Sequence, residues 1–161
     1  MLLSKKPLRL LLEPDGEPMM KSLNILYVED NQQIRDTVCE LLEGDSRKIS
    51  TFATAEDALI AFAKNSFDVV MTDISLPGLS GTDFTRRVLA AQPAQWVVLC
   101  SGYAMPPDLT KLGPNVRSLL KPFEFEELAS LLDKIAIAMT GSTLERKVSA
   151  VSACAPVPQE V

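Results

Sequence analysis

The sequence predicts an α/β fold, a doubly wound five-stranded parallel sheet with helices on both faces. Two observations lead to it. Along residues 22–140, short apolar runs alternate with segments in which apolar residues recur at helical spacing. The runs themselves are almost continuously apolar, which is typical of strands buried on both faces of a parallel sheet. A repeated strand–helix unit therefore accounts for this whole region.

The first two strand–helix units are predicted from apolar spacing and capping residues. Residues 23–28 form the first apolar run, and Gly44 is placed to end the helix that follows. That helix carries four apolar residues at helical spacing: Ile34, Val38, Leu41 and Leu42. A short strand is expected at 48–52. Thr54, with Asp57 three residues later, is typical of the start of the next helix.

The same alternation continues to residue 139. Strands are expected at 67–72, 96–100 and 116–120, and helices at 81–91 and 123–139. The last helix has a single apolar stripe, made of Phe125, Leu128, Leu131, Leu132, Ile135 and Met139. Residues 105–115 contain several prolines and a glycine, so we expect about two turns of helix there at most.

The two ends of the chain are predicted to lie outside this domain. We expect residues 1–21 to form a flexible N-terminal extension and residues 141–161 to form a disordered tail, because the latter are small, polar and rich in proline. No apolar run approaches the ~20 residues that cross a bilayer, so the sequence predicts no membrane insertion.

Composition excludes several classes of protein. The net charge of −5 comes with no basic stripe, which argues against direct binding to nucleic acid. The chain has no histidine, which excludes His-based zinc sites, Ser-His and Cys-His nucleophile pairs, and a phosphohistidine on this chain. Three widely spaced cysteines predict free thiols in a reducing, cytoplasmic compartment, with Cys39 and Cys100 packed in the core.

Charged and polar residues that could bind a ligand or react lie at the ends of four of the predicted strands. Glu29-Asp30, Asp73, Ser101 and Lys121 each stand where a strand ends. The carboxyl ends of parallel strands meet at one edge of a sheet, so these side chains are expected to converge. Two carboxylates ~5 Å apart repel by roughly 3 kcal/mol at an effective dielectric constant of about 20. Such a cluster needs a cation, and oxygen ligands favour Mg²⁺, for which Mn²⁺ can substitute.

The segments that carry these residues resemble the receiver domain of bacterial response regulators. The matching text, in chain order, is 25–31 (ILYVEDN), 69–81 (VVMTDISLPGLSG), 99–102 (LCSG) and 119–123 (LLKPF). The resemblance covers residues 22–140. It implies a stand-alone receiver with the flavodoxin-like (β/α)5 fold, acting in a two-component phosphorelay.

The resemblance also implies a role for each residue. Asp73 is the nucleophile that accepts a phosphoryl group from a phosphohistidine on a sensor histidine kinase or a histidine phosphotransfer protein. Lys121 pairs with the phosphoryl oxygens, and Ser101 bonds the phosphoryl group. Pro122 is expected to follow a cis peptide bond. The Mg²⁺ ligands implied are Glu29, Asp30, Asp73 and the backbone carbonyl of Ser75. No enzymatic activity is expected beyond self-catalysed phosphoryl acceptance and autodephosphorylation.

Three functional hypotheses remain open. In the first, phosphorylation of Asp73 switches the affinity for an unidentified protein target or relays phosphate. In the second, the chain is a receiver-like scaffold that binds without phosphorylation. Ser118 keeps this hypothesis open, because many receivers carry Tyr or Phe three residues before the lysine. In the third, the chain is a Mg²⁺-dependent aspartate-nucleophile phosphatase. Ser75 argues against it, because enzymes of the haloacid-dehalogenase type need an aspartate two residues after the nucleophile.

Overall fold

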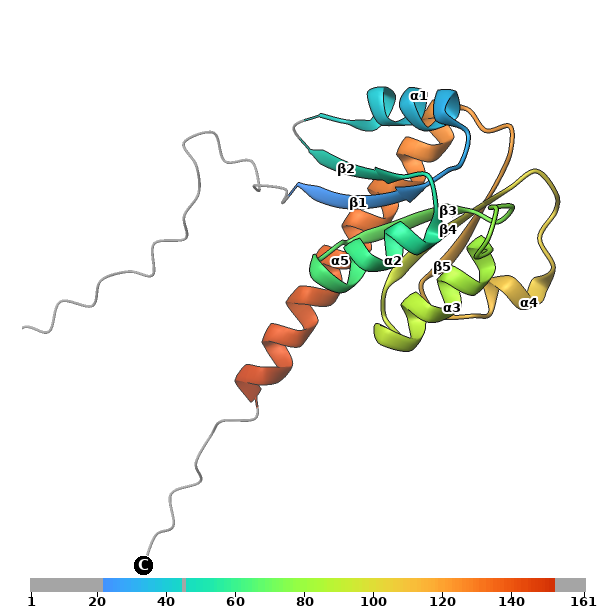
Figure 1. The fold of residues 1–161 in the computed structure, drawn as a ribbon. Helices are drawn as coiled ribbons and strands as arrows, with labels where there is room; N and C mark the ends of the chain where they lie inside the picture. Colours follow the sequence, from blue (N-terminus) through green and yellow to red (C-terminus); the bar gives the residue numbers. More distant parts are fainter. Residues whose placement is uncertain (1–21, 45, 153–161) are drawn as a thin grey trace, which may run out of the picture.

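One parallel sheet organises the molecule, as predicted. The computed structural model describes residues 22–44 and 46–152. Its five strands are all parallel and lie in the order β2-β1-β3-β4-β5 (Figure 1). The strands are β1 (Leu23–Val28), β2 (Arg47–Phe52), β3 (Val69–Asp73), β4 (Trp96–Ser101) and β5 (Val116–Leu120). The helices are α1 (Gln32–Leu42), α2 (Ala55–Lys64), α3 (Gly81–Ala91), α4 (Pro107–Thr110) and α5 (Phe125–Ser152).

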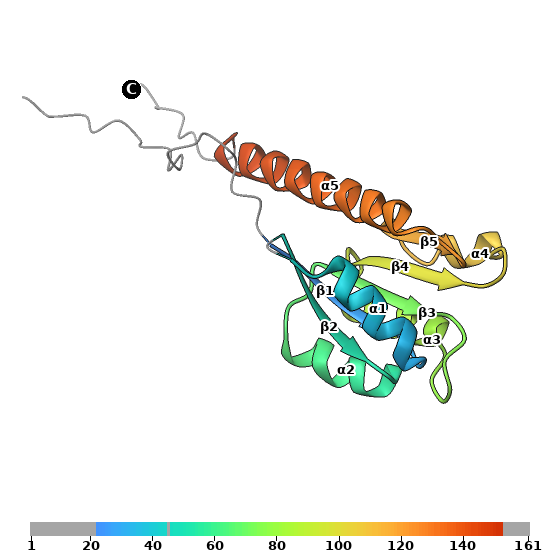
Figure 2. The same ribbon diagram turned by 90° about the horizontal axis from the view of Figure 1, so that it is seen from above.

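The helices form a layer on each face of the sheet (Figures 1 and 2). Helices α1 and α5 pack on one face, and α2, α3 and α4 pack on the other. Successive strand residues point to opposite faces, so Tyr27 joins the first core and Leu26 the second. Both are buried, which explains why the strands are apolar almost without interruption.

Side-chain caps fix where the helices begin. Thr54 accepts the N–H of Asp57 at 3.2 Å, which confirms the predicted start of α2. Asn31 and Ser80 act in the same way for α1 and α3. Two of these caps, Asn31 and Ser80, lie close in sequence to the polar residues that end β1 and β3. The helix starts are therefore held near the carboxyl edge of the sheet.

Of two expectations about helix length, one is confirmed and one is wrong. Helix α4 has only four residues, which is within the limit of about two turns that the prolines of this segment predicted. Helix α5 has 28 residues and runs to Ser152, so the disordered tail expected from residue 141 is wrong for 141–152. Figures 1 and 2 show α5 extending well past the end of the sheet. Residues 1–21 and 153–161, expected to be flexible and disordered, lie outside the described residues.

The predicted apolar faces of α1 and α5 are only partly buried. Val38 and Leu42 are buried as expected, but Ile34 and Leu41 are 41% and 52% exposed. At the start of α5, Phe125 is 36% exposed. Within the described part of the chain, no helix is long and apolar enough to cross a membrane.

Candidate functional site

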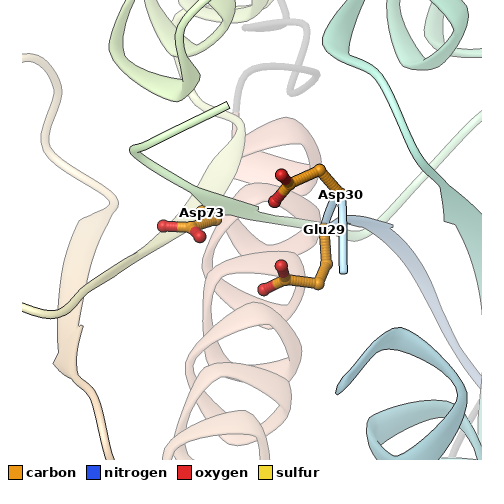
Figure 3. A group of neighbouring side chains, drawn as sticks. All are labelled: Glu29, Asp30 and Asp73. Atoms are coloured by element: carbon orange, nitrogen blue, oxygen red, sulfur yellow. The ribbon is translucent and has the colours of Figure 1, made fainter. Parts of the chain in front are cut away.

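Three carboxylates meet at the carboxyl edge of the central strands. Glu29 and Asp30 follow β1, and Asp73 is the last residue of β3. These strands are hydrogen-bonded neighbours, with Val28 opposite Thr72, so their ends coincide. One oxygen from each carboxylate lies within 4.8 Å of the others (Figure 3). The predicted convergence of these residues is confirmed.

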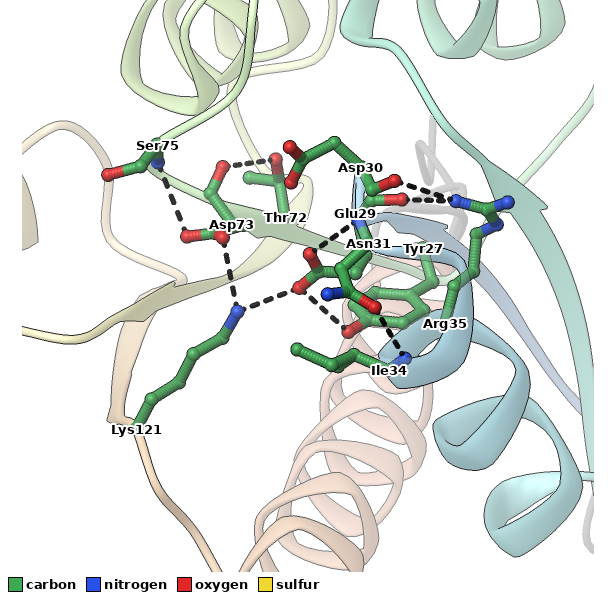
Figure 4. A network of polar contacts seen from close by, with 10 residues as sticks. All are labelled: Tyr27, Glu29, Asp30, Asn31, Ile34, Arg35, Thr72, Asp73, Ser75 and Lys121. Atoms are coloured by element: carbon green, nitrogen blue, oxygen red, sulfur yellow. Dashed lines mark hydrogen bonds and ion pairs between the residues drawn. The ribbon is translucent and has the colours of Figure 1, made fainter.

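Lys121 closes the cluster from the end of β5. Its Nζ donates to Glu29 Oε2 at 2.7 Å and to Asp73 Oδ2 at 3.1 Å (Figure 4). The Glu29 side chain is only 2% exposed, that of Asp73 14%, and that of Lys121 21%. Burial lowers the pKa of Lys121, but the hydrogen bonds and charges of the two carboxylates outweigh burial and raise the pKa above its usual value. The ammonium is therefore retained at neutral pH and offsets part of the cluster's negative charge.

Neighbouring residues fix the Glu29 carboxylate and the turn that carries it. Oε1 accepts the backbone N–H of Asn31 at 3.1 Å, and Oε2 lies 3.5 Å from the hydroxyl of Tyr27. Arg35 Nη1 donates to the backbone carbonyl of Glu29 at 2.7 Å and contacts that of Asp30 at 3.4 Å. Sequence reasoning did not find these three contributors. The only available signal was Asn31, because asparagine is a common N-cap residue at the start of a helix. Its side chain accepts the backbone N–H of Ile34, three residues later.

The Asp73 carboxylate is held by the loop that leaves β3. Oδ1 accepts the backbone N–H of Ser75 at 3.2 Å, and the Thr72 hydroxyl donates to the Asp73 carbonyl at 2.9 Å. The loop closes where Gly81 N–H donates to the Ile74 carbonyl at 3.0 Å. One oxygen of Asp73 thus faces Lys121 and the other faces a backbone donor. The role of the Ser75 carbonyl as a metal ligand stays a prediction.

The remaining predicted residues lie beside the cluster. Ser101 ends β4 next to Cys100, which pairs with Asp73 across the sheet. The Ser101 hydroxyl accepts the N–H of Tyr103 at 3.1 Å, and the Ser101 carbonyl accepts the N–H of Lys121 at 2.7 Å. The peptide bond between Lys121 and Pro122 is cis, as expected.

The other positions that the sequence singled out lie away from the acidic cluster or deeper in the core. Ser118 lies exposed on β5, opposite Leu99. Cys100 is a free thiol that is fully buried in the first core, as predicted. Burial raises its pKa to about 12. Cys39 is only half-buried and belongs to neither core, so its predicted place in the core is wrong.

Glu56, on α2, also holds the loop that follows Asp73. Its Oε1 accepts the N–H of Leu79 at 2.9 Å. Gly78 adopts a φ of +73°, and a Cβ there would lie 2.6 Å from the same oxygen. The Leu79 hydrogen bond, helped by the charge of Arg87, lowers the pKa of Glu56. The sequence offered no signal for this contact, because it joins side chain and backbone across 23 residues.

We expect the loop to loosen in acid. A carboxyl whose pKa is lowered by folding stabilises the folded state above its unfolded pKa of about 4.3, and this contribution is lost as pH falls through the lower folded value. The amide resonance of Leu79 should therefore titrate with a midpoint below the usual glutamate range, as NMR can measure. A Glu56→Gln variant should show no such titration. A Leu79 midpoint at or above the usual range would contradict the tether.

The donor set of the cluster fits a hard divalent cation. The side-chain ligands in this cluster are all carboxylate oxygens, from Glu29, Asp30 and Asp73. Hard cations such as Mg²⁺ prefer oxygen ligands. The cluster also keeps net negative charge, because Lys121 supplies one positive charge against three carboxylates. A cation bound by these residues would neutralise that excess.

Comparison with known proteins gives a consistent family. The sequence pattern of the response regulator receiver domain matches residues 25–133. The regulatory protein FixJ of Bradyrhizobium diazoefficiens is 29% identical over 113 residues, which are 68% of this chain and 55% of FixJ. The response regulator receiver protein CpdR of Brucella abortus is 26% identical over 117 residues, 71% of this chain and 97% of CpdR.

A solved structure gives the same result. The chemotaxis response regulator CheY4 of Vibrio cholerae superposes with a TM-score of 0.65 and 25% identity, covering 71% of this chain and 99% of CheY4. In contrast, the chain spans only 32% to 56% of the length of several longer transcriptional regulators that it matches.

Proposed function

Because the chain belongs to the response regulator receiver family, we propose that Asp73 accepts a phosphoryl group and that this modification switches or relays a signal in a two-component system. The observation that carries the proposal is the geometry of one carboxylate. Asp73 has one oxygen 3.1 Å from an ammonium and the other 3.2 Å from a backbone N–H, beside two further carboxylates. This environment suits attack on an anionic phosphorus centre.

The chemistry follows from this environment. An Asp73 oxygen forms a bond to phosphorus, while the bond from phosphorus to the donor's histidine nitrogen breaks and its electron pair stays with that nitrogen. Charge on the transferring oxygens must be neutralised during this step. Lys121 supplies a cation at the attacking residue. A Mg²⁺ ion held by Glu29, Asp30 and Asp73 would supply further neutralisation, and Mn²⁺ is expected to substitute.

We further propose that the chain transforms no second substrate and that its chemistry is limited to accepting and losing its own phosphoryl group. A phosphatase of the aspartate-nucleophile type needs an acid two residues beyond the nucleophile. Here that residue is Ser75, whose hydroxyl is a far weaker acid than a carboxyl group. The free thiols of Cys39 and Cys100 support a cytoplasmic location for the protein.

The phosphodonor is proposed to be a histidine-containing protein that docks beside the acidic cluster. An apolar groove of about 520 Å³ lies between α1 and the start of α5, and Lys121 is one of the residues that line it. Its exposed apolar side chains include Ile34, Leu41 and Phe125. A donor bound in this groove is placed next to Asp73, because Lys121 joins the groove to that carboxylate.

We expect a Leu41→Glu variant to lose phosphotransfer from a protein donor but not from a small one. The new carboxylate would be buried when the donor docks, and this should slow transfer from a phosphorylated sensor kinase by about 10- to 100-fold. Acetyl phosphate needs no docking surface. Radiolabel transfer from the kinase and mass spectrometry with acetyl phosphate measure the two rates. Ile60→Glu is the matched control, because Ile60 is 56% exposed on α2, across the sheet. Equal losses in both variants would contradict the groove's role.

The proposal is tested by intact-mass spectrometry after incubation with acetyl phosphate and Mg²⁺. We expect one phosphoryl adduct on the wild-type chain. The adduct should be absent from Asp73→Asn, which keeps the side chain's size but not its nucleophilic charge. It should also be absent when Mg²⁺ is chelated, and should return with Mn²⁺. A wild-type chain that binds Mg²⁺ but forms no adduct would favour the constitutive scaffold instead, and an adduct retained by Asp73→Asn would place the acceptor elsewhere.

A further inference from the structure

A tyrosine hydroxyl lies beneath the acidic cluster. Tyr27 is 1% exposed and its ring packs in the core between the sheet and helices α1 and α5. Its hydroxyl points out of that core toward Glu29 Oε2, at 3.5 Å (Figure 4). A phenylalanine would fill the same apolar space, so packing alone does not account for the hydroxyl. A buried hydroxyl needs a hydrogen-bond partner, and Glu29 is the acceptor that it faces.

Two donors share the same carboxylate oxygen, and they do so unequally. Lys121 Nζ is 2.7 Å from Glu29 Oε2, a short charge-assisted hydrogen bond. The Tyr27 hydroxyl, at 3.5 Å, is at the outer limit for a hydrogen bond. With Lys121 in place, Oε2 is already satisfied and the tyrosine contributes little. The other carboxylate oxygen, Oε1, has its own donor in the N–H of Asn31.

The balance changes if Lys121 turns toward a phosphoryl group on Asp73. Lys121 Nζ already bridges Glu29 and Asp73, so a new anion on Asp73 competes directly for it. Glu29 Oε2 would then be a buried anionic oxygen without its short bond. Leaving a buried charged acceptor unsatisfied costs more than a typical hydrogen bond contributes.

We propose that Tyr27 is a positioning residue whose hydroxyl takes over Glu29 Oε2 when Lys121 turns from Glu29 to the phosphoryl group. This inference rests on the proposed function of Asp73. The hydroxyl acts as a reserve donor: nearly idle in the resting protein and needed in the phosphorylated one. The movement required is small. The hydroxyl now lies 3.5 Å from Glu29 Oε2, and a typical hydrogen bond between two oxygens is about 2.8 Å long.

The first test compares Tyr27→Phe with the wild type in resting and phosphorylated-like states. Without ligand, the two melting temperatures should agree within about 2 °C. Affinity for beryllofluoride with Mg²⁺, a phosphoryl mimic measured by calorimetry, should fall about 10-fold, and adduct formation from acetyl phosphate should slow by a similar factor. Mg²⁺ affinity alone should change by less than about threefold. Tyr103→Phe, the same change at an 81% exposed position, should match the wild type in all measurements.

The second test does not require phosphorylation. In a Lys121→Ala background, Glu29 Oε2 has already lost the ammonium, so the hydroxyl should be needed in the resting state. Adding Tyr27→Phe there should lower the melting temperature at about pH 8 by about 5 °C, against about 2 °C or less in the wild-type background. If the Lys121→Ala background does not fold, the beryllofluoride comparison decides alone.

The outcomes separate the two proposals. Weaker beryllofluoride binding with an unchanged resting melting temperature supports the reserve donor. If wild type forms the Asp73 adduct and Tyr27→Phe binds the mimic as tightly as wild type, the role of Tyr27 is overturned and the proposed function stands. A parallel loss of resting stability and of affinity also overturns it, because the tyrosine would then be structural. A wild-type chain that forms no adduct and binds no mimic overturns both.

Discussion

Replacing Gly81 with alanine is expected to lower the free energy of unfolding by about 3 kcal/mol, a large effect for one methyl group. A Cβ at this position would lie 1.9 Å from the backbone carbonyl oxygen of Asp73 and 2.8 Å from the carbonyl carbon. Both atoms are backbone, so no side-chain rotation can relieve the overlap. Either the start of α3 or the end of β3 must move.

The movement should also disturb the site. The Gly81 N–H closes the loop on the Ile74 carbonyl, directly after Asp73. Displacing this loop shifts the Ser75 N–H that holds Asp73 Oδ1. Acceptance of phosphate from acetyl phosphate is therefore expected to fall by about 10-fold or more even in the folded fraction, because small misplacements of reacting groups are costly.

Urea unfolding and adduct formation measure the two effects. Gly44→Ala is the matched control, since a Cβ at Gly44 would meet nothing within 4 Å. That variant should change the free energy of unfolding by less than about 1 kcal/mol and leave the acceptance rate unaltered. If Gly81→Ala were as stable as Gly44→Ala, the close approach of α3 to Asp73 would be wrong.

The sequence predicted the site well because the parallel topology of the sheet determines where most of the site residues lie. Once β1, β3 and β5 are recognised as strands, their ends must share one edge of the sheet. The positions of Glu29, Asp73 and Lys121 follow from that fact alone, and the structure brings them within hydrogen-bonding distance. No side-chain detail was needed to predict this.

The sequence predicted less where side chains from distant segments meet. The Glu56 contact to Leu79 crosses 23 residues and joins α2 to a loop, and no local pattern encodes it. Tyr27 resembled any other apolar residue of a buried strand, because its ring is packed as one. Only the packed structure shows that its hydroxyl faces Glu29.

The error in the length of the last helix has a local cause. Gly141, Ser142 and Thr143 suggested that the last helix ends near residue 140. Each costs a helix only about 0.5–1 kcal/mol relative to alanine, and none removes a backbone hydrogen bond as proline does. The residues that follow, 144–148 (LERKV), are mostly good helix formers, so α5 continues to Ser152.

Replacing Lys121 with methionine is expected to lower the free energy of unfolding by about 3 kcal/mol in the absence of divalent cations. Methionine keeps much of the apolar stem but removes the ammonium. Glu29, whose side chain is 2% exposed, would then be a buried charge without its cation. Breaking a buried pair on one side is costly, because the remaining charge keeps the full penalty of leaving water.

Mg²⁺ should restore much of the lost stability. With Lys121 gone, Glu29, Asp30 and Asp73 have no positive partner among the contacts that define the cluster, and a divalent cation supplies one. We expect the variant to bind Mg²⁺ about 10-fold more tightly than the wild type while accepting phosphate about 100-fold more slowly. Tighter metal binding together with slower transfer would show that Lys121 has two roles: it offsets the charge of the carboxylates, and it neutralises the transferring phosphoryl oxygens.

The pH dependence gives an independent check on the same ion pair. The pKa of Lys121 is raised in the folded protein, so its stabilising contribution is complete below the unfolded value of about 10.4 and is lost as pH rises through the higher folded value. The stability difference between wild type and Lys121→Met, measured by urea unfolding without Mg²⁺, should stay constant up to about pH 10 and shrink above it. Lys134→Met, the same change at an exposed position of α5, should show neither the loss nor the pH dependence. A difference that persists unchanged at high pH would mean that the apolar stem, and not the ammonium, stabilises this edge of the sheet.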